Sequence, residues 1–306
     1  MLSFNQKTIK KNIHFEGIGL HTGKKVNIEL IPAEPNHGIV FKRIDLKSKN
    51  LINADFNNVK SALLCTTLQN EYGVSVSTIE HLMGALFGEQ IDNLLIKVDS
   101  QELPIMDGSA KKFIEEIRNS GVKNYEVSKR FIKVMKKIEY RSGSKFMSFE
   151  PLDNDLEINF EIIYKNKLIG SQKKETSLYK DNIDEIYNSR TFCLYEDIEK
   201  VKSMGLGIGG SLDNAVIVKD SEILNKDGLR YQDEFVKHKI LDCMGDIALA
   251  NFGFFGKIKC SQGGHKLTNE FLRKFFFDKK NYSIVEFKEK KVLNSPSFVK
   301  PLAATA

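Results

Sequence analysis

Strands followed by helices occur in this order twice along the chain, and this repeated order limits the architectures that the chain can adopt. In the first half, apolar and polar residues alternate over residues 25–30 and 94–98, which predicts strands. Apolar residues recur at helical spacing over residues 78–87, and a second helix is expected over residues 111–119. We therefore expect separate stretches of strand and helix in this half.

The second half of the chain shows the same order of elements. It predicts strands over residues 130–140, 146–149 and 156–164, helices over residues 183–189 and 235–251, and a loosely structured tail over residues 294–306. Segregated strands and helices are typical of the α+β class, so we expect α+β layers. No exact internal repeat is visible, so only the shared order of elements indicates a duplicated domain.

A chain of 306 residues exceeds the size at which one hydrophobic core usually suffices, although a single large domain stays open. Residues 121–129 combine Gly, Asn, Ser and charged residues, which is typical of a connecting segment. We therefore place a boundary near residue 126 and expect two domains, residues 1–126 and residues 127–306.

Net charge and cysteine content narrow the classes of protein. The formal charge of +6 favours an anionic partner, such as a nucleotide, a phosphorylated substrate or an anionic membrane surface. The cysteines lie far apart and form no Cys-x-x-Cys pair, which argues against a zinc ribbon and a disulfide-stapled scaffold. They are Cys65, Cys193, Cys243 and Cys260.

Two stretches bear on the compartment. Residues 1–15 lack the continuous apolar core of a secretory signal, and the longest apolar stretch, residues 247–256, is too short to span a bilayer. We therefore expect a cytoplasmic protein in a reducing environment.

His238 and Asp242 stand four residues apart in a segment predicted to be helical, so both side chains project from one helix face. That face could bind one metal ion. Asp246 extends the row by another turn, where it could support a ligand or orient a catalytic neighbour. A plain polar pair on a solvated helix face gives the same spacing and stays open as the alternative.

Glu80 and His81 are adjacent, so on a helix their side chains point in different directions. One of them could bind a metal ion while the other contacts the water bound to that ion. With His81, His238 and Asp242 as ligands, the ion would have two imidazoles, one carboxylate and an open position, the composition expected of catalytic zinc. Ferrous iron suits the same ligands and stays open. Glu80 would be the general base, unless the capping-box pattern that begins at Ser77 directs it back to the helix cap.

Glycine-rich segments support other functions. Residues 205–210 match G-x-G-x-x-G, but the helix expected before them and the strand expected after them reverse the order of a dinucleotide-binding fingerprint. Residues 17–24 resemble a P-loop only in part, because the glycine spacing differs. A non-catalytic nucleotide-diphosphate-binding protein therefore stays open, as does a nucleic-acid binder. His265 follows two glycines, where it could protonate a departing amine or be an exposed loop histidine.

Six stretches carry specific motifs in both halves of the chain. They are GIGLHTGKK at 17–25, STIEHLMGAL at 77–86, IDNLLIKVDSQELPIMDGSA at 91–110, SRTF at 189–192, GLGIGGSLDNAVIV at 205–218 and HKILDCMGD at 238–246. In these stretches the sequence resembles the UDP-3-O-acyl-N-acetylglucosamine deacetylases of the lipid A pathway. The resemblance extends from about residue 8 to residue 269.

The resemblance implies a fold of two similar domains, each a small β-sheet layered with α-helices, with the active site between them. It implies a zinc-dependent amidohydrolase that removes the N-acetyl group of UDP-3-O-(3-hydroxyacyl)-N-acetylglucosamine and releases acetate and the free amine. Zinc would be held by His81, His238 and Asp242, the three residues that the spacing also selects.

The resemblance also implies roles for other residues. Glu80 would activate the water, His265 would act as general acid tuned by Asp246, Thr191 would help to stabilise the oxyanion, and Lys239 and Phe192 would contact the substrate, with Lys239 at its phosphates. Residues 200–212 would help to build a passage for the acyl chain. Cys193 and Leu194 depart from the usual Gly and aromatic residue of the family.

We expect a monomer whose partner is the small-molecule substrate, an acylated UDP-GlcNAc, and no nucleic acid. Lys133, Lys136 and Lys137, together with the Phe-rich residues 271–277, leave transient contact with the inner membrane surface open. The alternative for residues 271–277 is a buried helix with a solvated lysine face.

Overall fold

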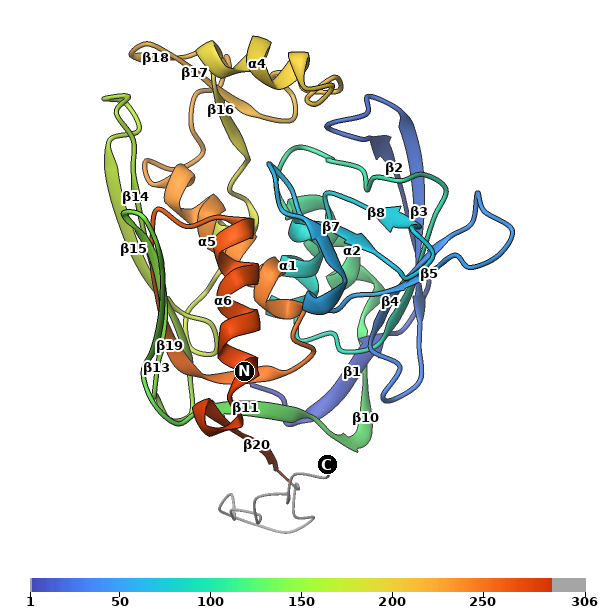
Figure 1. Ribbon diagram of the computed structural model, residues 1–306. Helices are drawn as coiled ribbons and strands as arrows, with labels where there is room; N and C mark the ends of the chain where they lie inside the picture. Colours follow the sequence, from blue (N-terminus) through green and yellow to red (C-terminus); the bar gives the residue numbers. More distant parts are fainter. Residues whose placement is uncertain (1, 288–306) are drawn as a thin grey trace.

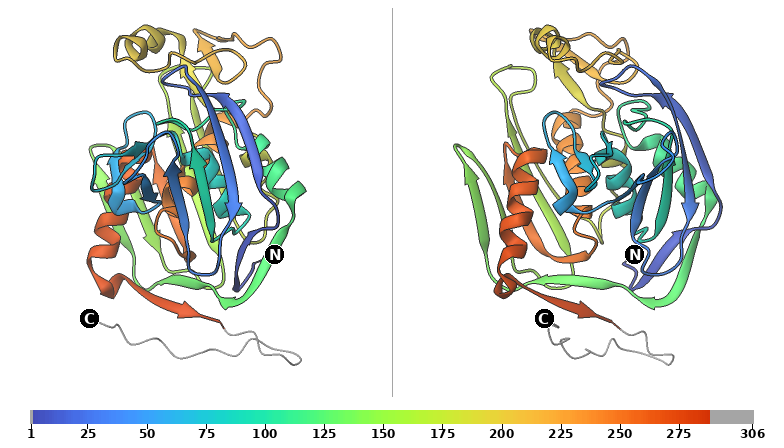
Figure 2. Two further views of the ribbon diagram at one scale, coloured as in Figure 1. Left: turned by 90° about the vertical axis from the view of Figure 1, so that its right-hand side faces the viewer. Right: turned by 45° about the vertical axis from the view of Figure 1, so that its right-hand side comes forward.

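The computed structural model describes residues 2–287, and the tail expected over residues 294–306 lies outside this range. Two larger β-sheets form the outer layers, and the helices at the centre of the molecule lie between them (Figures 1 and 2). A smaller part, labelled α4 and β16 to β18, covers one end of these layers at the top of Figure 1. The fold is therefore α+β, as the order of elements predicts.

The sheet of the first half has five strands in the order β2-β3-β9-β4-β5. They are β2 (Ile13–Ile18), β3 (Lys25–Pro32), β9 (Leu94–Val98), β4 (Ile39–Arg43) and β5 (Leu51–Asn53). β4 and β9 pair in parallel, and the other neighbours are antiparallel. The alternation over residues 25–30 predicted this face correctly, because Val26, Ile28 and Leu30 are buried.

Helices and a small sheet complete the first half. They are α1 (Glu80–Gly88), α2 (Lys111–Ser120), the short turn η1 (Phe56–Asn58) and the strands β6 (Val59–Ser61), β7 (Thr67–Gln69) and β8 (Ser75–Val76). Helix α2 begins where it was expected, but α1 begins two residues after residue 78. The φ angle of Thr78 is 57°, a left-handed conformation that keeps this residue out of the helix.

The sheet of the second half has seven strands. They are β11 (Arg130–Val134), β12 (Ile138–Ser142), β13 (Lys145–Glu150), β14 (Leu156–Ile163), β15 (Ser171–Ser177), β19 (Gly253–Ser261) and β20 (Tyr282–Glu286). The strand set expected to begin over residues 130–140 is confirmed, as the two strands β11 and β12. The chain leaves β11 at Met135, whose N–H donates to Asn281 O at 2.9 Å, because β11 pairs with β19 and β20 whereas β12 pairs with β13.

The remaining helices and strands also belong to the second half. They are α3 (Asp184–Tyr187), β16 (Phe192–Leu194), η2 (Tyr195–Asp197), α4 (Ile198–Ser203), β17 (Val216–Lys219), β18 (Glu222–Ile223), α5 (Glu234–Ala248), α6 (His265–Phe277) and η3 (Lys279–Asn281). The buried-helix interpretation of residues 271–277 is confirmed for Phe271 and Phe275, which are buried, while Phe277 is exposed. Helix α4 precedes the glycines of residues 205–210 and β17 follows them, in the order that argues against a dinucleotide fingerprint.

The segment expected to connect two domains is a strand. β10 (Val122–Ser128) pairs antiparallel with β1 (Asn5–Ile9) at the bottom of Figure 1. Tyr125 is buried in it, and its hydroxyl donates to Ala33 O at 2.7 Å. The composition of residues 121–129 suggested a linker because polar strands and linkers are both rich in Asn, Ser and charged residues. The division into residues 1–126 and 127–306 stays a proposal, and residue 126 lies inside β10.

Buried apolar side chains form one cluster that extends through both halves. Leu82 and Met83 of α1 belong to it together with Leu241 and Met244 of α5. The two helices therefore bury their apolar faces in one core between the sheets, which positions their polar side chains relative to each other.

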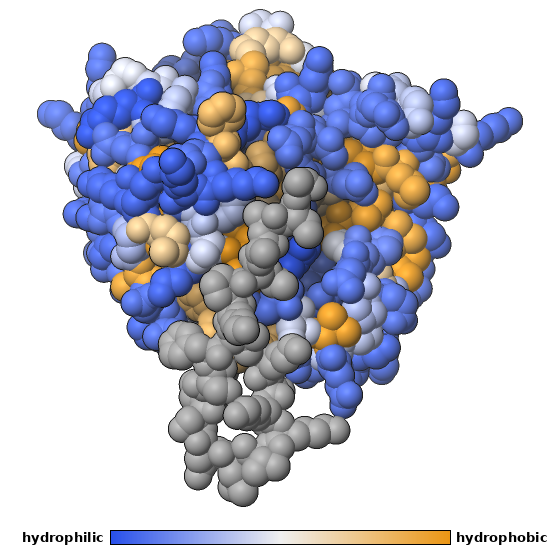
Figure 3. All heavy atoms as spheres, turned by 60° about the horizontal axis from the view of Figure 1, so that its bottom comes forward, coloured by the Kyte–Doolittle hydropathy of each residue, from blue (hydrophilic) through white to orange (hydrophobic). Residues whose placement is uncertain are grey.

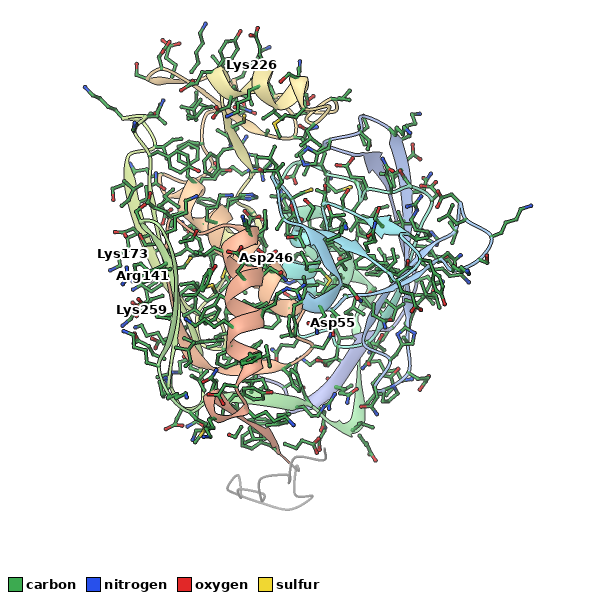
Figure 4. All side chains as sticks on the ribbon, viewed as in Figure 1. Asp55, Arg141, Lys173, Lys226, Asp246 and Lys259 are labelled. Atoms are coloured by element: carbon green, nitrogen blue, oxygen red, sulfur yellow. The ribbon has the colours of Figure 1, made fainter. Side chains whose placement is uncertain are left out.

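The polar residues of the second half separate into outer and inner groups. Arg141, Lys173 and Lys259 point outward from the seven-stranded sheet, whereas Asp246 lies within the helical layer (Figure 4). On the face turned forward in Figure 3, the described side chains are mostly hydrophilic and apolar groups are interspersed among them. Within residues 2–287, no helix combines the length and apolarity needed to cross a bilayer.

Candidate functional site

Helices α1 and α5 cross in direct backbone contact at two glycines. A Cβ atom on Gly245 would lie 2.1 Å from Glu80 O, and a Cβ atom on Gly84 would lie 2.9 Å from Leu241 O. Because Cβ atoms do not approach carbonyl oxygens this closely, only glycine permits the crossing. It sets the start of α1 against the middle of α5.

The three side chains expected to bind metal meet at this crossing. Nε2 of His81 lies 3.6 Å from Oδ1 of Asp242, and Nε2 of His238 lies 3.4 Å from the same oxygen. His238 and Asp242 are 1% and 3% exposed, so the alternative of a solvated polar pair is wrong. Among residues 2–287, these three are the one group of His, Cys, Asp or Glu side chains arranged to hold a metal ion.

The donor atoms of this group fit a divalent cation. Oδ1 of Asp242 is buried and has no hydrogen-bond partner among the described residues. Nδ1 of His238 lies 3.0 Å from Ser189 O, and its N–H donates to this carbonyl, which leaves the lone pair of Nε2 for an ion. Burial lowers the pKa of His238 to about 3, so the imidazole is neutral, as a metal ligand must be.

The other oxygen of Asp242 is already engaged. Oδ2 accepts a hydrogen bond of 2.8 Å from Nζ of Lys239. Burial alone would raise the pKa of Asp242, but the ammonium group of Lys239 next to it helps to hold that pKa well below its usual range. Burial alone would lower the pKa of Lys239, but Asp242 outweighs this effect and raises it. Asp242 and Lys239 therefore stay ionised as a pair, with the candidate ligand His238 next to them.

Glu80 is the first residue of α1, and its carboxylate does not cap that helix. Oε2 accepts a hydrogen bond of 3.0 Å from the backbone N–H of Thr66. The cap residue is Ile79 and no side chain caps the helix, so the capping-box interpretation of Ser77 is wrong. The left-handed conformation before the helix turns Ser77 away, which a spacing rule does not register.

Burial also changes the acidity of Glu80. It raises the pKa of the carboxyl group, against the opposing charges of His265 and His81. A carboxylate with a raised pKa accepts a proton more readily near neutral pH than an exposed one. Glu80 is therefore suited to general-base chemistry.

His265 begins α6 and is 9% exposed, so the alternative of an exposed loop histidine is wrong. Nδ1 lies 2.9 Å from Oδ2 of Asp246, and Nε2 lies 3.8 Å from Oε1 of Glu80. Oγ1 of Thr66 donates to the other oxygen of Asp246 at 2.6 Å. Burial alone would lower the pKa of His265, but Asp246 and Glu80 raise it to about 10. His265 can therefore carry a proton at neutral pH.

A cavity of about 620 Å³ lies beside these side chains. His265, Lys239, Thr191 and Phe192 all line it. The ring of Phe192 packs edge-on against Phe235 with ring centroids 4.8 Å apart, and Nζ of Lys239 lies 5.5 Å from the centroid of Phe192. The structure thus brings every residue of the expected site to one cavity or to the side chains that surround it.

A second cavity of about 380 Å³ is lined mainly by apolar side chains. These are Leu20, Leu64, Ile198, Val201, Leu212, Ala215, Ile217 and Leu224. The two cavities are adjacent and share one wall. Five residues line both of them: Leu64, Thr191, Phe192, Cys193 and Val201. Residues from the stretch 200–212 contribute to both cavities.

A buried carboxylate ties the turn at residues 19–23 to the start of α1. Glu102 is 0% exposed, and its oxygens accept hydrogen bonds from the backbone N–H groups of His21 and Thr22 at 2.7 and 2.8 Å. The hydroxyl groups of Thr22 and Thr78 donate to the same carboxylate at 2.7 and 3.0 Å. Every one of these partners is a neutral donor, so the charge is stabilised by hydrogen bonds alone.

A family model described as UDP-3-O-acyl N-acetylglycosamine deacetylase matches residues 6–277. The chain belongs to this family. The UDP-3-O-acyl-N-acetylglucosamine deacetylase of Haemophilus influenzae strain PittEE is 41% identical over 291 residues, which cover 93% of this chain and 94% of the relative. The enzymes of that name from Histophilus somni strain 129Pt and Pasteurella multocida strain Pm70 are 40% and 39% identical, over 93% and 94% of this chain and 94% and 95% of the relatives.

Membership of the deacetylase family confirms the resemblance seen in the sequence, but the supporting residues of the site were missed. Thr66 and Ser189 hold Glu80, Asp246 and His238 in place, and neither has a spacing that marks it. Ser189 opens the stretch SRTF, which could have drawn attention to it, whereas Thr66 lies in none of the six stretches.

The departure at Cys193 lies at the wall between the two cavities of this deacetylase. Burial raises the pKa of the Cys193 thiol to about 11. The side chain therefore stays neutral at physiological pH and adds a small apolar group to the wall.

Proposed function

We propose that the chain hydrolyses the N-acetyl group of a UDP-3-O-acyl-N-acetylglucosamine, releasing acetate and the free amine, in lipid A biosynthesis. The observation that carries this proposal is the convergence of three buried elements: the imidazoles of His81 and His238, the unpartnered oxygen of Asp242, and the neighbouring pair Glu80 and His265. Family membership supports the same substrate class, because the relatives are named for it.

His81, His238 and Asp242 would hold the metal ion, which we propose to be zinc, with ferrous iron as the alternative. When bound, such an ion acts as a Lewis acid that lowers the pKa of water and stabilises negative charge on oxygen. Ser189 and Lys239 would orient the imidazole of His238 and the carboxylate of Asp242 for this purpose.

Glu80 and His265 would move the protons of the reaction. Glu80 takes a proton from the attacking water as the new bond between oxygen and the acetyl carbon forms. His265 gives its Nε2 proton to the nitrogen as the C–N bond breaks, so that the amine leaves neutral. Their atoms Oε1 and Nε2 are 3.8 Å apart, close enough to serve two ends of one amide group.

The lining of the two cavities supports the rest of the assignment. The Thr191 hydroxyl would stabilise the oxyanion, and Lys239 and Phe192 would contact the substrate head, with Lys239 at the phosphates. The acyl chain would occupy the apolar cavity that shares a wall with this site. We further propose a cytoplasmic monomer of two domains that contacts the inner membrane surface transiently.

Removal of metal provides the direct test. Treating the purified protein with a chelator and removing the chelator should lower the rate of acetate release by more than about 100-fold, and one equivalent of zinc should restore it. Magnesium should not restore activity, because it prefers six oxygen ligands. A protein that binds UDP-sugar with or without chelator and never releases acetate would support the non-catalytic nucleotide-diphosphate-binding alternative instead.

Asp246→Asn should move the alkaline limb of the kcat/KM profile to lower pH by roughly one to three pH units. The negative charge of Asp246 raises the pKa of His265. The acid form of His265 is lost as pH rises through that pKa. Without the charge the pKa is lower, so the acid form is lost at a lower pH. The profile is measured by acetate release. Thr66→Val is the matched control, because it removes a hydrogen bond to Asp246 but leaves its charge. An alkaline limb that does not move in Asp246→Asn would contradict the assignment of His265 as the acid.

A further inference from the structure

One face of α5 carries a row of four polar side chains, each one helical turn after the last. They are Glu234, His238, Asp242 and Asp246, and all four are buried. His238 and Asp242 are candidate metal ligands, and Asp246 contacts His265. Glu234 begins the row, one turn before the first candidate ligand.

The carboxylate of Glu234 holds the side chain of Arg190 in a fork. Nε of Arg190 donates to Oε1 at 2.8 Å, and Nη2 donates to Oε2 at 3.1 Å. Nη2 also donates to Gly228 O at 2.8 Å. A planar guanidinium group that donates to both oxygens of a carboxylate is held in direction as well as in distance. Arg190 and Glu234 therefore have one fixed arrangement at the start of α5.

The peptide unit between Ser189 and Arg190 connects this ion pair to His238. Its N–H, which belongs to Arg190, donates to Oε1 of Glu234 at 3.0 Å. Its C=O, which belongs to Ser189, accepts from the Nδ1–H of His238 at 3.0 Å. Because a peptide unit is planar and rigid, the bond at its N–H also fixes the direction of its C=O. The two bonds thus connect neighbouring positions of the row on α5.

The direction of this C=O matters for His238. Its bond to Nδ1 keeps the ring in the tautomer whose Nε2 lone pair is available to an ion, and it fixes the rotation of the ring. The chain continues directly into Thr191, which lines the reaction cavity and whose backbone N–H donates to Gly108 O at 2.7 Å. A change at Arg190 would therefore reach the site through the backbone.

We propose that Arg190 is a positioning residue for the candidate metal ligand His238. It acts through Glu234, which fixes the peptide unit that follows Ser189. This inference rests on the proposed function and adds to it a residue that acts through other groups. The ion pair sets the direction of the imidazole before any ion binds.

Arg190→Lys tests the proposal without leaving the charge of Glu234 unpaired. The ammonium group of lysine is a point charge and does not reproduce the fork or the bond to Gly228. We expect the Kd for zinc, measured by competition with a chelator, to rise about 10- to 100-fold. At saturating zinc, kcat for acetate release should fall by about 10-fold. KM should change by less than about 2-fold, because the lining of the reaction cavity is kept.

Arg43→Lys is the matched control for the loss of a buried fork. Arg43 lies in β4 and is 8% exposed, as Arg190 is. Its Nε and Nη2 donate to the two oxygens of Asp45 at 2.8 and 2.6 Å, and Nη1 donates to Ser75 O at 2.7 Å. Both variants should lose a similar amount of stability in chemical denaturation. Arg43→Lys should keep the wild-type zinc Kd and kcat.

A spectroscopic measurement and a second variant follow the route of the effect. In the metal-free protein, the ¹⁵N shifts of the His238 ring should show the Nδ1–H tautomer in the wild type and a mixture of tautomers in Arg190→Lys. Glu234→Gln places an NH₂ group where Oε2 now accepts from Arg190 and from the backbone N–H of Arg230. It should also raise the zinc Kd. Combining the two substitutions should add little to the larger single effect, because both break one contact.

The outcomes distinguish this inference from the function on which it rests. If zinc Kd and ring tautomer in Arg190→Lys equal those of Arg43→Lys, positioning by Arg190 is refuted while deacetylation stands. An unchanged zinc Kd in Glu234→Gln, or effects of the two substitutions that simply add, would also overturn the proposal. If the zinc-loaded wild type releases no acetate, the proposed function fails, and zinc Kd and tautomer still decide the role of Arg190.

Discussion

Gly245→Ala should destabilise the protein by about 3 kcal/mol and abolish metal binding, although the same change in an exposed helix ordinarily stabilises it by about 1 kcal/mol. The added Cβ atom would lie 2.1 Å from Glu80 O, a backbone atom that cannot rotate aside. Helix α1 must therefore move away from α5. His81 then leaves Asp242, because the two ligands are carried by the two helices. Chemical denaturation and the zinc content of the purified protein measure the two effects.

Gly264→Ala is the matched control for this substitution. No atom lies within 4 Å of its added Cβ atom, and its φ of 176° is extended backbone that alanine adopts freely. We expect a change in stability of less than about 0.5 kcal/mol and an unchanged zinc content. Wild-type stability and zinc content in Gly245→Ala would mean that the helices do not cross at this distance.

Glu80→Gln should lower kcat by about 10²- to 10⁴-fold while the metal stays bound. The amide keeps the shape of the side chain and an oxygen that accepts from the N–H of Thr66, so the start of α1 is preserved. It has no charge with which to take a proton from water. Acetate release under saturating substrate gives kcat, and metal analysis of the same sample shows whether the site is intact.

Glu89→Gln controls for the loss of one carboxylate next to the same helix. Glu89 follows the last turn of α1, where its carboxylate accepts from Arg118 far from the reaction cavity. Its kcat should equal that of the wild type. If Glu80→Gln kept full kcat with metal bound, another group would have to be the base, and His265 would be the first to test.

The candidate metal ligands could be predicted from the sequence because each segment that carries them has a recognisable local pattern. His238 and Asp242 share one helix, and helical spacing is enough to put them on one face. The same reasoning could not show that the face is buried, since burial depends on α1 packing across it at Gly84 and Gly245. A glycine within a helix has no pattern that identifies its partner.

Other errors arose where tertiary contacts outweighed local preference. The capping-box pattern at Ser77 failed because Thr78 adopts a left-handed conformation and donates to Glu102, which lies far along the chain. Residues 121–129 have the composition of a linker, but pairing with β1 makes them a strand. Strand pairing between distant segments is not encoded in either segment alone.

Glu102 connects two parts of the site through one buried carboxylate. It holds the turn that ends at Gly23 and also Thr78, two positions before Glu80. Neither the apolar cavity, which we propose to hold the acyl chain, nor the start of α1 can shift without straining the other. A substrate with a badly fitting tail should therefore react slowly even when it is fully bound, and discrimination should be visible in turnover as well as in affinity.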